Sequence, residues 1–217
     1  MARFCTILLC ALLVSGHQSA NPARKPVAIT VELTGQQDVQ RLLDGLEKTD
    51  ARVTFFFEDG AIEPEQARII AEGGHEMALT VHSRENGLLL SRRNLAAQIV
   101  DARAVLPRSV KPHWLRLKEG LTDGSRQVAR VKNLAILAEN EGVLDLGQAS
   151  VDEVLLTVNR LRGQGYSMVT VSELARMNRV KVRPGKVYDG HLRQNADSRP
   201  FTVLTDCAQT AMDSPTA

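Results

Sequence analysis

The sequence has few cysteines and little net charge, and each shortage excludes a class of protein. Cys5 and Cys10 lie in an apolar N-terminal stretch, so Cys207 is the one cysteine in the rest of the chain. A framework of internal disulfides is therefore excluded there, and stability must come from a packed core. The formal net charge is only +2, and no long basic run interleaves with aromatic residues. We therefore expect no nucleic-acid partner.

The length and hydrophobic content indicate one domain with ordinary packing. The chain has 217 residues, of which 43% are hydrophobic. That size favours one domain with dispensable ends over two full domains. The hydrophobic fraction is large enough to build a core, which excludes wholesale disorder.

The first twenty residues are typical of a targeting segment. Arg3 gives a short positive start, residues 4–14 are almost uninterruptedly apolar, and small or polar residues fill 15–20. The apolar stretch is shorter than the roughly 20 residues that a membrane-spanning helix needs. We interpret 1–20 as a signal peptide or short anchor, which predicts a secreted, periplasmic or cell-envelope protein. Membrane contact is expected only through an uncleaved N-terminal segment, and the alternative is a cytosolic start with a buried helix.

Apolar runs and helical patterns alternate along the chain. Helical spacing of apolar residues follows the first strand, and Pro64, Ser91 and Ser150 stand where helices begin, with Ser172 opening a last short helix. Strands alternating with helices predict parallel pairing, so we expect an α/β fold, a distorted or incomplete (β/α) barrel with about seven strands. The expected strands span residues 27–33, 53–57, 76–81, 114–117, 134–137, 143–146 and 168–171.

The pattern ends near residue 177. We therefore place the domain at residues 27–177 and interpret 178–217 as a flexible tail, with one short strand at 201–204 as an alternative. The basic residues at the start of the tail favour a solvated segment, although they would also suit acidic wall polymers or anionic lipid.

Four segments, in order, resemble the polysaccharide deacetylase (NodB-homology) family. They are residues 27–33 (VAITVEL), 51–56 (ARVTFF), 74–77 (GHEM) and 165–174 (GYSMVTVSEL). Each is similar to a strand or strand-helix segment of that family, and together they cover about 27–177. The resemblance implies a (β/α) barrel that hydrolyses acetyl groups from glycans. In that chemistry an Asp acts as base on a water, while a second Asp and two His hold a divalent metal.

The residues at the family's functional positions differ from the expected set. The base position falls on Glu32, still a carboxylate. The three metal-ligand positions fall on Leu33, Thr80 and Arg84, of which leucine has no donor atom and arginine repels a cation. A late His that protonates the leaving amine is expected within 144–148, where the sequence has none.

These replacements predict a noncatalytic relative. The family's Arg-Pro-Pro-Tyr-Gly segment aligns with residues 116–120 (RLKEG), which keeps Arg116 and the glycine. Because loss of ligands removes metal affinity, we expect no resident metal and a binding or scaffolding role on an envelope or extracellular glycan. The alternative is an active, divergent hydrolase that removes N- or O-linked acetyl groups with Glu32 as base. A third possibility is a partner-binding regulator whose tail is the active part.

The remaining candidates each have a structural alternative. Glu32 and Arg116 could be remnants of the site or could form an ion pair at the open end of the barrel. A relocated zinc site would have to combine Glu32 with His75, His82 and Glu85, and the alternative is two hydrogen-bonded structural histidines. Trp114, beside the arginine segment, is a candidate for stacking on a sugar, and its alternative is a core aromatic residue.

Overall fold

The computed structural model describes residues 24–138, 143–189 and 192. The expected signal at 1–20 and the alternative strand at 201–204 lie outside the described residues. Among the helices that are described, none is both long and apolar enough to cross a membrane.

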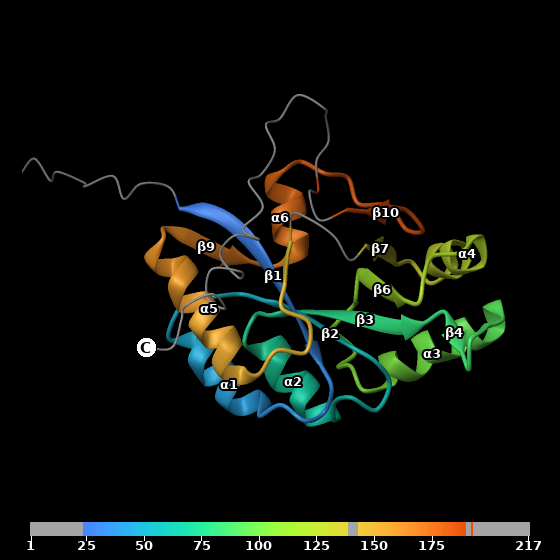
Figure 1. The fold of residues 1–217 in the computed structure, drawn as a ribbon, viewed down its shortest axis with the longest axis horizontal. Coiled ribbons are helices and arrows are strands. Elements are labelled where there is room, and N and C mark those ends of the chain that lie inside the picture. The colour runs from blue at the N-terminus through green and yellow to red at the C-terminus, as the bar shows by residue number, and fades with distance from the viewer. Residues whose placement is uncertain (1–23, 139–142, 190–191, 193–217) are drawn as a thin grey trace, which may run out of the picture.

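Eight strands form one curled parallel sheet (Figure 1). The order is β10-β7-β6-β3-β2-β1-β8, and β9 pairs with the first residues of β1. This arrangement confirms the predicted distorted (β/α) barrel. The strands are β1 (Lys25–Leu33), β2 (Thr54–Phe57), β3 (Glu76–His82), β6 (Trp114–Lys118), β7 (Ala135–Leu137), β8 (Leu144–Asp145), β9 (Tyr166–Val169) and β10 (Val187–Tyr188), and a separate hairpin holds β4 (Arg84–Glu85) and β5 (Leu88–Leu89).

The helices pack on both faces of the sheet. In Figure 1, α1, α2 and α5 lie together on one face, whereas α6 lies on the opposite face, against β1. The predicted starts at Pro64, Ser91 and Ser150 are confirmed, but Thr170 rather than Ser172 caps α6. The helices are α1 (Val39–Glu47), α2 (Pro64–Glu72), α3 (Arg92–Ala104), α4 (Asp123–Val131), α5 (Val151–Gly163) and α6 (Val171–Met177).

Alternation along β1 divides the core into two parts. Successive side chains of a strand point to opposite faces. Val31 and Leu33 therefore join the core between the sheet and helices α1, α2, α3 and α5. Ala28 points the other way and joins Phe56, Trp114 and α6 on the concave face. Every side chain of β1 on the concave face is consequently in a position to take part in a site inside the barrel.

Residues 178–189 belong to the fold, which corrects the expected tail. Val187 and Tyr188 pair with β7, and the N–H of Gly185 donates to the carbonyl of Leu134 at 2.8 Å. The Tyr188 ring meets the Trp114 ring edge-on, with centroids 5.7 Å apart. A two-residue strand is too short to show a period in the sequence, so this segment was not recognisable there.

A chain that ends at Met177 should be markedly less stable than one that ends at Leu192. The shorter chain loses β10 and uncovers the face of Trp114 that Tyr188 covers, which should cost about 2–4 kcal/mol of unfolding free energy. Urea unfolding of the two chains measures the difference. Equal midpoints would show that residues 178–192 contribute nothing to the fold.

Candidate functional site

The carboxyl ends of β1, β6 and β8 bring four charged side chains together. In a parallel barrel all strands end at the same rim, where sites of such folds form. Here β1 supplies Glu32, β6 supplies Arg116 and Lys118, and β8 supplies Asp145. We call this region the mouth, defined by these four residues and Thr30.

Arg116 is held below the rim by Thr30, Asp145 and the ring of Phe56. Its side chain is 3% exposed, and its guanidinium carbon lies 4.1 Å from the centroid of the Phe56 ring. Nη2 donates to Thr30 Oγ1 at 3.2 Å and pairs with Asp145 Oδ2 at 3.2 Å. Thr30 Oγ1 in turn donates to Asp145 Oδ1 at 2.8 Å. The predicted location of Arg116 at the mouth is therefore correct, but its partner is Asp145.

Glu32 pairs with Lys118, which corrects the expected ion pair between Glu32 and Arg116. The Glu32 carboxylate contacts the Lys118 ammonium, and their side chains are 9% and 22% exposed. Lys118 and Asp145 are functional-site partners that the sequence pattern did not predict. A signal for Lys118 was available, because it lies two residues after Arg116 and so shares its face of the strand.

The residues at the family's ligand positions do not fit a divalent cation. Leu33 packs into the helix-side core, 1% exposed. Thr80 is buried beside Arg116 on the neighbouring strand, and Thr80 Oγ1 and Arg116 Nε have no hydrogen-bond partner among the described residues. Arg84 is exposed and donates from Nη1 to the Gly87 carbonyl at 3.0 Å. One hydroxyl next to a guanidinium is not a cation site, since the fixed positive charge repels the ion.

His75 lies at the far end of β3 from the mouth and is structural. Its Nδ1 accepts from the backbone N–H of Val53 at 3.2 Å, and its ring meets Phe55 edge-on at 5.4 Å. Burial, with a smaller contribution from the charge of Arg52, lowers the pKa of His75 to about 4. The neutral imidazole therefore supports the start of β3.

His82, at the rim end of the same strand, lies between two glutamates. Nε2 is 2.8 Å from Glu58 Oε2 and Nδ1 is 2.7 Å from Glu119 Oε1. Burial lowers the pKa of His82, but hydrogen bonds to Glu119 and Glu58 outweigh it, and the pKa is raised. Glu85 is exposed on the β4–β5 hairpin. The four residues of the relocated zinc site do not converge. Within residues 24–138 and 143–189, no group of three or more His, Cys, Asp or Glu side chains is arranged to hold a metal.

Trp114 is a core residue, which corrects its prediction as a sugar-stacking platform. Its side chain is fully buried, and its indole N–H donates to Ser172 Oγ at 2.9 Å. A ring enclosed by α6 and Tyr188 presents no face to a sugar. Its position follows from the alternation that also turns Arg116 inward.

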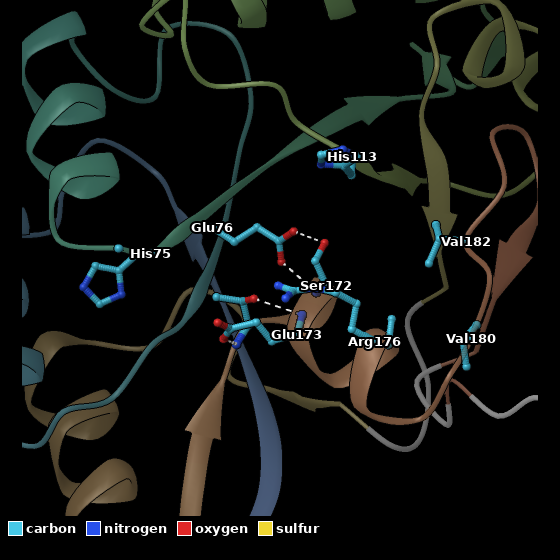
Figure 2. A pocket seen from close by; sticks show the side chains of 11 residues that line it. His75, Glu76, His113, Ser172, Glu173, Arg176, Val180 and Val182 are labelled. Atoms are coloured by element: carbon cyan, nitrogen blue, oxygen red, sulfur yellow. Dashed lines mark hydrogen bonds between the residues drawn. The ribbon is translucent and has the colours of Figure 1, made fainter.

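A cavity of about 510 Å³ lies at the opposite end of the sheet from the mouth (Figure 2). Within it, Glu76 at the start of β3 accepts from the backbone N–H of Ser172 at 3.1 Å and from the Ser172 hydroxyl. Glu76 Oε2, which accepts from the Ser172 N–H, also accepts from the Thr54 hydroxyl at 2.8 Å. Glu76 thus ties β2 and β3 to the start of α6, which gives the Gly-His-Glu segment a structural role.

The clamp of His82 between Glu58 and Glu119 should make stability depend on pH. Because the folded pKa is above the ordinary value of about 6.5, the stabilisation is full below that pH and is lost as pH rises through the raised pKa. All three side chains are partly exposed, so we expect on the order of 1 kcal/mol or less. Urea unfolding of the wild type and His82→Gln at about pH 6 and about pH 9 measures it.

NMR titration of the His82 ring gives the pKa directly and should place it above the ordinary value. His75 titrates in both proteins, so the difference between them isolates His82. A difference in unfolding free energy that stays constant between the two pH values would contradict the clamp.

Solved structures share this fold. The Xyl-CE4 domain of a multidomain xylanase from the hindgut metagenome of Trinervitermes trinervoides is 17% identical, with a TM-score of 0.65, over 79% of this chain and all of that one. A family 4 acetyl xylan esterase from Clostridium thermocellum, solved with a cobalt ion, is 18% identical, with a TM-score of 0.63, over 76% and 98%.

A third similar structure is a CE4 family pseudoenzyme from Bacillus anthracis. It is 17% identical, with a TM-score of 0.58, over 77% of this chain and 70% of that one. Among curated proteins, none matches the chain. The profile of the polysaccharide deacetylase family matches residues 19–135, more than half of the sequence. With the curled parallel sheet described above, this match shows that the chain belongs to the polysaccharide deacetylase family.

Proposed function

We propose that the protein is an exported deacetylase-like domain that binds a glycan of the cell envelope without hydrolysing it. The observation that carries the proposal is the set of residues at the ligand positions. Leu33 points into the helix-side core, Thr80 offers one hydroxyl beside a guanidinium, and Arg84 points to solvent. A metal-assisted hydrolase needs donors that hold an ion next to the substrate.

The ion pairs of Glu32 and Arg116, the two residues retained at functional positions of the family, support the same proposal. A general base must be within reach of the proton it removes, with the water activated beside it. The Glu32 carboxylate is instead paired with the Lys118 ammonium, and the region where the leaving-group acid is expected holds Asp145, which pairs with Arg116. The mouth is thus filled by interactions that support structure.

The comparisons support a polysaccharide as the ligand and include a similar structure described as a pseudoenzyme. The matched family is named for polysaccharide deacetylation, and one structure with this fold is described as a pseudoenzyme. The targeting pattern of 1–20 supports export, and a polymer of N-acetylated or O-acetylated sugars in the cell envelope is the partner that follows from the two together.

Three measurements on the mature chain test the proposal. With chitooligosaccharides or acetylated xylan, acetate release should not exceed the blank without protein, and elemental analysis should find no stoichiometric zinc. Isothermal titration should detect binding of at least one of these glycans. Stoichiometric metal with acetate release would overturn the noncatalytic part, and absence of glycan binding would overturn the binding part.

The second candidate is an active hydrolase with Glu32 as base, because a carboxylate remains at the base position on the mouth. Glu32→Gln separates the two functions if acetate release is found. A true base would lose nearly all turnover, by at least about a hundredfold. The matched variant Lys111→Met, at an exposed lysine before β6, should change nothing.

A further inference from the structure

Lys118 lies on the opposite side of the mouth from its partner. In the sheet, β3 and β2 separate β6 from β1, so the Lys118 side chain crosses two strands to reach Glu32. The Lys118 ammonium therefore lies beside the base position, against the Glu32 carboxylate.

The end of β6 is fixed so that Lys118 can make this contact. The Lys118 carbonyl accepts from the Ser83 N–H at 3.1 Å and from the Ser83 hydroxyl at 2.8 Å. Ser83 is 1% exposed, so this pair of bonds is shielded from water. The direction of the lysine side chain is thereby set by the adjacent strand end.

Glu32 needs a cation in this place. A buried carboxylate without an opposite charge is strongly destabilising. The other described cations near the mouth already have partners: Arg116 pairs with Asp145, and His82 lies between Glu58 and Glu119. Among described side chains, Lys118 is the one that pairs with Glu32.

We infer that Lys118 is an internal replacement for the metal ion, supplying from within the chain the positive charge that offsets Glu32. An ammonium donates hydrogen bonds but cannot accept an electron pair from a ligand, so the replacement keeps the charge balance of the mouth and loses the Lewis acid. The inference goes beyond glycan binding, because it states what holds the mouth together without an ion.

A double-mutant cycle tests the pairing. Lys118→Met keeps the apolar stem and removes the charge, and it should lower Tm by about 5 °C or more. Glu32→Gln alone should also lower Tm, whereas the double variant should lose clearly less than the sum of the two. Lys118→Arg, which keeps the charge, should lose less than Lys118→Met and provides a folded variant if the latter does not fold. Lys111→Met is the exposed control.

One further readout separates an internal charge from a bound ion. Addition of zinc or EDTA should leave the Tm of the wild type unchanged. Additive losses in the cycle, or a wild type stabilised by zinc, would each overturn the inference. None of these results depends on glycan binding or acetate release, which test the proposed function separately.

Discussion

The mouth of this barrel depends on the pairing of charges that are removed from water. Glu32 with Lys118, and Arg116 with Asp145, each join strands that are distant in sequence and sit on one concave face. Either charge alone would be costly in such a place, whereas the pair is tolerated when the geometry is good and other polar groups are bonded. Thr30 bonds to both members of the Arg116–Asp145 pair, although Arg116 Nε has no partner among the described residues. The four charged side chains of the mouth thus pair with one another.

Strand alternation decides which residues can belong to that set. On β1, Thr30 and Glu32 face the concave side while Leu33 faces the helices, and on β6 the same rule turns Trp114, Arg116 and Lys118 inward. The lower part of the concave face is closed by Trp114 and α6, so polar groups collect above it, at the rim. The alternation of side chains along the strands therefore determines both which residues pack into the core and which residues form the mouth.

The local part of this arrangement was predictable from sequence, and the pairing was not. Runs of β-branched and aromatic residues predicted the main strands, and the resemblance to the deacetylase family placed Glu32 and Arg116 at one rim. The partners of these residues depend on strand order and curl, since Arg116 and Thr30 are 86 residues apart. Trp114 lies in an expected strand, but the sequence does not show that α6 and Tyr188 cover its face of the sheet. The two residues of β10 were too few to form a pattern.

The two ends of β3 explain how family resemblance persists where residues at the family's ligand positions are replaced. At the start of the strand, His75 and Glu76 hold β2 and α6 in place, and the Gly-His-Glu segment is retained there. At the rim end, Thr80 stands at a ligand position and has no ligand role in this arrangement. In barrels, residues at the bottom serve stability and residues at the rim serve chemistry. A chain released from hydrolysis would keep the first set, because the fold still requires it, and could exchange the second for ion pairs.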